Sequence, residues 1–129
     1  MLEEIKKRIL ADLEPIPSGY RNDSVTKEII RCVLYNYIKE QGLIPVPEYR
    51  VPRYPEGPVD IAALDKNNEI RMAIGSAPTV ELKLVKSMDR IDAQRKIIIT
   101  FSAYEKKVKE SAFFLNKTIE HLHLYGGGD

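Results

Sequence analysis

The sequence predicts an α/β fold, a mixed β-sheet with helices on its faces, and three observations support this. Apolar residues recur every three or four positions in residues 2–13 and 25–37, as on one face of an amphipathic helix. Between residues 43 and 84 apolar and polar residues largely alternate, as in half-buried strands. The chain has 129 residues, of which 43% are apolar, so one domain with a sizeable core is expected.

Two helices are predicted at the start of the chain. The first covers Leu2–Leu13, and the prolines and glycine of residues 15–19 end it. The second is expected to begin at a cap formed by Asp23 or Ser24 and to end before Gly42, which is suited to a left-handed conformation. The buried stripe predicted for this helix consists of Val25, Ile29, Cys32, Val33 and Tyr37.

Strands are predicted after the second helix. Residues 44–51 alternate and contain two prolines, which is typical of an edge strand. Residues 59–64 and 70–74 are expected to pair as a hairpin through a turn at 65–68. Residues 79–84 alternate clearly and are predicted to form a further strand.

The last third of the chain is ambiguous. Four β-branched residues at 97–100 favour a strand, but apolar residues spaced by three or four over residues 93–108 favour a helix, with Ser87 as its cap. The longer pattern is preferred, followed by a short strand at 111–115 and a helical turn at 118–125. The helical pattern comprises Ala93, Ile97, Phe101, Tyr104 and Val108.

These elements form one domain with an α-β-β-β-α-β core. The expected divisions are an N-terminal helix and linker in residues 1–19, the core in 24–116 and a C-terminal tail in 117–129, with a frayed end at the terminal glycines.

The charge and the apolar content of the chain exclude some classes of protein. A net charge of +1 excludes a polycationic nucleic-acid coat, but residues 83–109 hold eight basic and three acidic residues, a local surplus that suits a partner bound at one place. The densest apolar run, Ile97–Phe101, is far too short to span a membrane. The single cysteine and the acidic first residues predict an unexported, cytoplasmic protein.

Two acids interrupt apolar stretches. On an alternating strand Glu81 and Lys83 project to the same side, and Asp60 lies within an apolar run. If the two strands are neighbours, these three side chains meet, and paired carboxylates attract Mg²⁺ or Mn²⁺. The backbone carbonyl of Leu82 is a plausible further ligand. Lys83 would hold the attacking water or the phosphate.

This arrangement resembles the PD-(D/E)XK nuclease superfamily, which includes restriction endonucleases and Holliday-junction resolvases. The matching pieces are residues 57–60 (Gly-Pro-Val-Asp), the Glu-x-Lys element at 81–83, and Glu28 on the preceding helix. The resemblance implies a restriction-endonuclease-like fold and metal-dependent cleavage of DNA. It also implies that Glu28, Asp60 and Glu81 bind Mg²⁺ or Mn²⁺ and that Lys83 orients the nucleophile.

DNA is the expected partner. Lys86, Arg90, Arg95 and Lys96 follow the predicted site and are candidates for phosphate contacts, although the solvated face of a helix explains them equally well. A chain of this length has little surface to wrap a duplex, so a homodimer is expected, through the first helix.

Two other functions stay open. One is a non-catalytic nuclease-fold protein that acts as a nucleic-acid-binding or assembly subunit, and the other is an unrelated α/β interaction domain. Other candidate residues carry less weight. His121 and His123 lack a third metal ligand nearby in the sequence, Cys32 is expected in the core, and the Glu-x-Arg pair at 69–71 has arginine in place of lysine.

Overall fold

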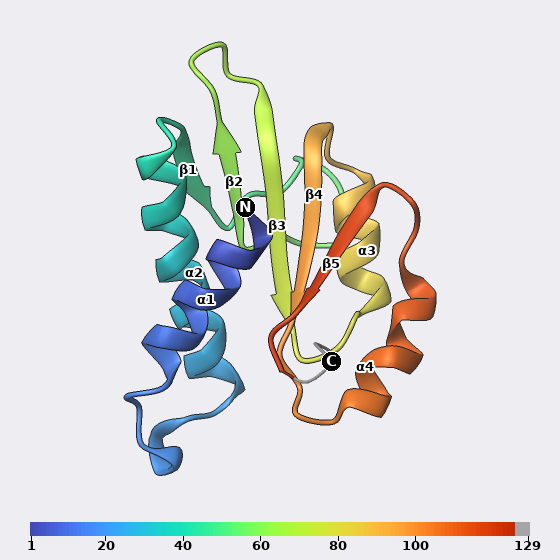
Figure 1. Cartoon of the computed structure of the whole chain (residues 1–129). Helices are drawn as coiled ribbons and strands as arrows, with labels where there is room; N and C mark the ends of the chain where they lie inside the picture. The colour runs from blue at the N-terminus through green and yellow to red at the C-terminus, as the bar shows by residue number, and fades with distance from the viewer. Residues whose placement is uncertain (126–129) are drawn as a thin grey trace.

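The computed structural model describes residues 1–125 (Figure 1). The terminal glycines predicted to form a frayed end lie outside the described residues. No helix within residues 1–125 is long and apolar enough to cross a bilayer. The elements are α1 (Leu2–Leu13), a 3₁₀ turn (Ser18–Tyr20), α2 (Asp23–Glu40), β1 (Ile44–Pro47), β2 (Ile61–Leu64), β3 (Ile70–Ala77), α3 (Leu82–Asp89), β4 (Ala93–Thr100), α4 (Glu105–Ser111), a second 3₁₀ turn (Ala112–Phe114) and β5 (Ile119–His123).

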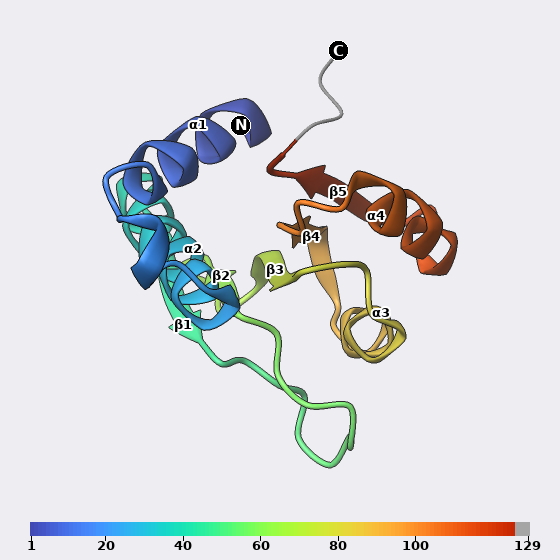
Figure 2. The same ribbon diagram turned by 90° about the horizontal axis from the view of Figure 1, so that it is seen from below.

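The five strands form one mixed sheet in the order β1-β2-β3-β4-β5. Strands β1, β2 and β3 pair antiparallel, whereas β3, β4 and β5 are parallel. Parallel neighbours require a crossover, and α3 and α4 supply the two that are needed. Seen from below, α1 and α2 lie on one side of the sheet and α3 and α4 on the other (Figure 2). The predicted α/β class, a mixed sheet flanked by helices, is confirmed.

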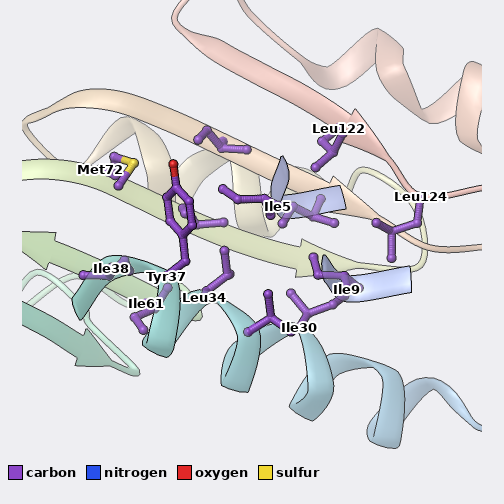
Figure 3. Packing of buried hydrophobic residues seen from close by; sticks show 14 of the residues in the cluster. Ile5, Ile9, Ile30, Leu34, Tyr37, Ile38, Ile61, Met72, Leu122 and Leu124 are labelled. Carbon is purple, nitrogen blue, oxygen red and sulfur yellow. The ribbon is translucent and has the colours of Figure 1, made fainter. Parts of the chain in front are cut away.

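The larger core lies between the sheet and the first two helices. Side chains from α1, α2 and the strands meet there in one cluster (Figure 3). Of the stripe predicted for α2, Val33 and Tyr37 are buried in this core and Ile29 packs at its edge. The stripe also includes the fully buried Ile30, Leu34 and Ile38, one position further along the chain. The prediction that Cys32 belongs to the core is wrong, because its side chain is exposed.

A second core lies between the sheet and α3. Val85 and Met88 of α3 pack against the face of β3 and β4 there. The approach is close at Gly75 of β3, where a Cβ atom would lie 2.6 Å from a methyl carbon of Leu84. Glycine at this position therefore lets α3 lie directly on the sheet.

The early elements agree with the sequence prediction in most details. Helix α1 has the predicted bounds, and the hairpin of β2 and β3 forms. Gly42 follows α2 with a φ of +78°, as expected. The cap of α2 is Asn22, whose side chain accepts a hydrogen bond of 2.9 Å from the Val25 amide, and not Asp23 or Ser24. The edge strand ends at Pro47 and does not reach residue 51.

Four later predictions are wrong. Residues 79–84 are no strand, because Glu81 is the residue before α3 and Leu82–Asp89 is helical. The helix expected from Ser87 to Val108 is replaced by the end of α3, by β4 and by the start of α4. The strand expected at 111–115 is a 3₁₀ turn at the end of α4, and the helical turn expected at 118–125 is β5.

Candidate functional site

Asp60 lies at the start of β2 and is the central acid of the site. Ile61 pairs with Ile74 in the hairpin, which brings Asp60 beside the last residues of β3. Its side chain is only 4% exposed. Lys27 donates a hydrogen bond of 2.7 Å from Nζ to Oδ1, and the Ser76 hydroxyl donates a very short one to Oδ2. Both carboxylate oxygens are thus occupied by groups of this chain.

Lys27 connects the second turn of α2 to the sheet. Its Nζ atom also donates to the backbone carbonyl of Ser76 at 2.6 Å and lies 3.2 Å from the Ser76 hydroxyl. Lys27 reaches this position because it lies three residues before the fully buried Ile30, on the side of α2 that faces the sheet. Sequence analysis missed both Lys27 and Ser76, and the spacing from Ile30 was the signal that points to the lysine.

A pocket of about 230 Å³ is lined in part by Lys27, Asp60 and Ser76. It brings together three side chains that the sequence singled out, Asp60, Glu81 and Lys83. The chain does this in an unexpected way, because Glu81 and Lys83 stand at the N-terminus of a helix and not on a strand next to β2. The pocket is lined by Lys27, Arg31, Glu48, Glu56, Gly57, Pro58, Asp60, Ser76, Glu81, Lys83, Leu84 and Ser87.

The predicted accessory acid, Glu28, does not line this pocket. Its side chain is 62% exposed and lies 3.4 Å from Arg31. Arg31 also pairs with Glu48 at 3.1 Å, and these two side chains do line the pocket. The residue of α2 that contacts Asp60 is Lys27.

The arrangement around Asp60 does not fit a bound Mg²⁺ or Mn²⁺. The Lys27 ammonium already donates a hydrogen bond to Oδ1 of Asp60, and a divalent ion bound to this carboxylate would lie beside it and be repelled. The strand beside Asp60 carries Ser76 and no acid. Leu82 lies in the first turn of α3, where carbonyls accept the hydrogen bonds of the helix. Within residues 1–125 no group of three His, Cys, Asp or Glu side chains lies close enough together to hold a metal ion.

The four basic residues predicted to contact phosphates are divided between two places. Lys86 and Arg90 lie on α3 or at its end, close to Lys83. Arg95 lies on β4 and pairs with Glu120 through two hydrogen bonds of 2.8 and 2.5 Å. Lys96 follows Arg95 on the strand, so its side chain points to the opposite face of the sheet. Only the pair near α3 adjoins the pocket.

The long connection between β1 and β2 packs against α3. Ser87 donates a hydrogen bond of 3.1 Å to the Gly57 carbonyl. The Arg90 guanidinium lies 3.3 Å from Glu56 and 4.3 Å from the ring centre of Tyr54. We call the exposed side chains of residues 49–58 and 82–90 the loop–α3 surface.

Charges on the loop–α3 surface are unevenly paired. Glu48 and Glu56 each have an arginine partner, whereas Glu81 in the pocket and Asp89 at the end of α3 have no ion pair among the described residues. No carboxylate in the described part of the chain pairs with Arg53, Lys83 or Lys86. The surface thus presents unneutralised positive charge next to the mouth of the pocket.

The histidines lie elsewhere, at the end of β5. The hydroxyl of Thr100 lies 2.8 Å from Nε2 of His121 and 2.8 Å from Nδ1 of His123. Burial lowers the pKa of both imidazoles, and their proximity lowers that of His121 further. No third His, Cys, Asp or Glu side chain joins them in the described part of the chain.

Comparison with known proteins gives likenesses of structure alone. No family model and no curated protein matches the chain. The chain is similar to a cryo-EM structure of a DrdV–DNA complex, with 18% identity and a TM-score of 0.45 over 73% of this chain and 10% of that one. It is also similar to the crystal structure of a repair endonuclease from Pyrococcus abyssi, with 20% identity and a TM-score of 0.43 over 81% of this chain and 48% of that one.

Proposed function

We propose that this chain is a nuclease-fold protein that binds nucleic acid through the loop–α3 surface and needs no metal to do so. The observation that carries the proposal is the position of Lys83, Lys86 and Arg90. They are spaced three and four residues apart, so they form one stripe along α3 beside the pocket.

The chemistry of this stripe suits a phosphate backbone. Lysine and arginine neutralise phosphates and release condensed counterions, which supplies most of the affinity in sequence-independent binding. Lys83 and Lys86 have no acidic partner among the described residues, so binding would not require an internal ion pair to break. Tyr54 lies beside Arg90 and is 40% exposed, which leaves part of an aromatic ring available to a base.

The test is a fluorescence-anisotropy titration of labelled single-stranded and duplex DNA in EDTA at several salt concentrations. The variant Lys83→Ala/Lys86→Ala should bind more weakly, with a salt slope smaller by about 1.8 for a duplex and about 1.4 for a single strand. The matched control is Lys66→Ala/Lys117→Ala, which removes the same charge from exposed positions outside this surface. Equal losses in the two variants, or no binding by the wild type, would contradict the proposal.

A second candidate function is the Mg²⁺- or Mn²⁺-dependent hydrolysis of DNA that the sequence resemblance implies. One observation favours it, because Asp60, Glu81 and Lys83 line the same pocket. This function would require the Lys27 ammonium to move away from Asp60, so that the carboxylate can bind the ion. The test is cleavage of supercoiled plasmid and branched DNA with either ion. Cleavage by the wild type that is lost in both Asp60→Asn and Lys83→Ala would establish this function. No cleavage of either substrate would favour the non-catalytic function.

The homodimer expected from the short chain is part of the proposal as well. A dimer would double the basic surface that one DNA molecule can contact. Sedimentation equilibrium of the wild type with and without DNA gives the mass directly, and a monomer in both conditions would contradict a dimer.

A further inference from the structure

We infer that Lys27 is a built-in cation that fills the position where a divalent ion would neutralise Asp60. This goes beyond the proposed function, because it concerns the interior of the pocket and not the surface that meets the nucleic acid. Different experiments therefore test this inference and the proposed nucleic-acid binding, and either can be refuted without the other.

The first argument is the burial of Asp60. An ionised carboxylate that is 4% exposed must have a countercharge, since its loss of hydration is otherwise not offset. Of the cationic side chains that line the pocket, Lys27 is the one with an ion pair to Asp60, at 2.7 Å. The charge of the acid is thus balanced within the chain.

The second argument is the set of oxygens around the Lys27 ammonium. It has one carboxylate oxygen at 2.7 Å, one backbone carbonyl at 2.6 Å and one hydroxyl at 3.2 Å. Carboxylate and carbonyl oxygens are also the donors that a hard divalent ion prefers. Here they surround an ammonium group, and a second cation bound to the same oxygens would be repelled by it at short range.

The third argument is the residue that follows along the sheet. Ser76 is the residue of β3 that contacts Asp60. A second carboxylate at this position would give the site enough negative charge to hold a divalent ion as well as the lysine, but serine is neutral. Its hydroxyl donates a hydrogen bond to Oδ2 of Asp60 and adds no negative charge to the site. Glu81 is left as the one other acid of the pocket without an ion pair among the described residues.

The inference predicts that removing Lys27 creates a metal site. Lys27→Met keeps most of the side-chain volume and leaves the Asp60 and Glu81 carboxylates in one pocket without the ammonium. The matched control is Arg31→Met, which removes one positive charge from the same helix and the same pocket without touching Asp60. Lys27→Met/Asp60→Asn removes the new site again.

The experiment measures Mn²⁺ binding to the whole chain by electron paramagnetic resonance of the free ion. Lys27→Met should bind one Mn²⁺ at least about tenfold more tightly than the wild type. Arg31→Met and Lys27→Met/Asp60→Asn should behave like the wild type. Equal Mn²⁺ affinity in folded Lys27→Met and the wild type would overturn the inference, as would a tenfold gain in Arg31→Met.

The wild type provides a test that does not depend on a variant that folds poorly. We expect the wild type and Asp60→Asn to bind Mn²⁺ equally weakly, with no saturable binding in the wild type that is lost in the variant. Such binding would overturn the inference, because it would place the ion at Asp60 with Lys27 present. Anisotropy titrations with DNA are read separately, so a failure of nucleic-acid binding leaves this result interpretable.

Discussion

The ammonium nitrogen of Lys27 lies 2.7 Å from Oδ1 of Asp60, although 33 residues separate the two in the chain. The contact joins the second turn of α2 to the residue that precedes β2. Its partners differ in exposure, since the lysine side chain is 38% exposed and the carboxylate 5%. This asymmetry decides how each partner behaves when the other is removed.

Lys27→Met is expected to destabilise the fold more than Asp60→Asn. The buried carboxylate cannot reach water when its partner is lost, whereas the lysine can extend into solvent. We expect about 2–3 kcal/mol for Lys27→Met and about 1 kcal/mol for Asp60→Asn, values reduced for partial solvent screening. Urea denaturation of both single variants and the double variant measures this. Additive losses in the double variant would mean that the ion pair contributes no coupling energy.

Gly75→Ala is expected to destabilise the protein by about 1–3 kcal/mol. The new methyl group would lie 2.6 Å from a methyl carbon of Leu84, so the buried Leu84 side chain must leave its present position between α3 and the sheet. Gly19→Ala is the control, because a Cβ there meets nothing within 4 Å and its backbone is not left-handed. Thermal unfolding of both variants compares them. A Gly75→Ala variant as stable as Gly19→Ala would refute close packing of α3.

Acidification is expected to destabilise the protein below a pH of about 6.5. Burial lowers the pKa of His121 and His123, so the unfolded chain binds protons at a higher pH than the folded one. Their contribution to stability is therefore full above the unfolded pKa and declines as the pH falls towards the folded values. The carboxyl groups of Glu40 and Glu120, whose pKa is lowered by arginine partners, act only below about pH 4.5.

The measurement is the melting temperature between about pH 7.5 and about pH 5 for the wild type and for His121→Gln/His123→Gln. The wild type should lose stability across this range and the double variant should lose less. The slope is the informative quantity, since the substitutions also change the hydrogen bonds to Thr100. Parallel slopes in the two proteins would assign the pH dependence to other groups.

The elements that the sequence predicted well are those whose pattern depends on one buried face. Helix α1 and the hairpin of β2 and β3 each have a single apolar side and clear turn residues at their ends. Strand β4 misled the prediction because Ile97, Ile98 and Ile99 are all fully buried, on both faces of a central strand. Such a strand shows no alternation, and its apolar residues combine with those of α4 into a false helical period.

The sequence predicted which acids and lysine share the site, but it assigned the wrong secondary structure to Glu81 and Lys83, because a local pattern was misleading here too. Six alternating residues around Glu81 fit a strand locally, but Leu84, Val85 and Met88 are spaced as the buried side of a short helix, and Pro78 follows the end of β3. The pocket of Asp60, Glu81 and Lys83 forms through a helix N-terminus, which sequence alternation cannot reveal. The contact of Lys27 with Asp60 depends on how α2 docks on the sheet, and that is a tertiary property.

The most direct test of the central claim is a nuclear magnetic resonance titration of the ¹⁵N-labelled protein with a short DNA duplex in EDTA. The account predicts that amide shifts concentrate in residues 49–58 and 82–90, that they weaken with added salt, and that Lys83→Ala/Lys86→Ala reduces them. Shifts confined to other surfaces, such as α1 or the β5 edge, or no shifts without a divalent ion, would contradict it.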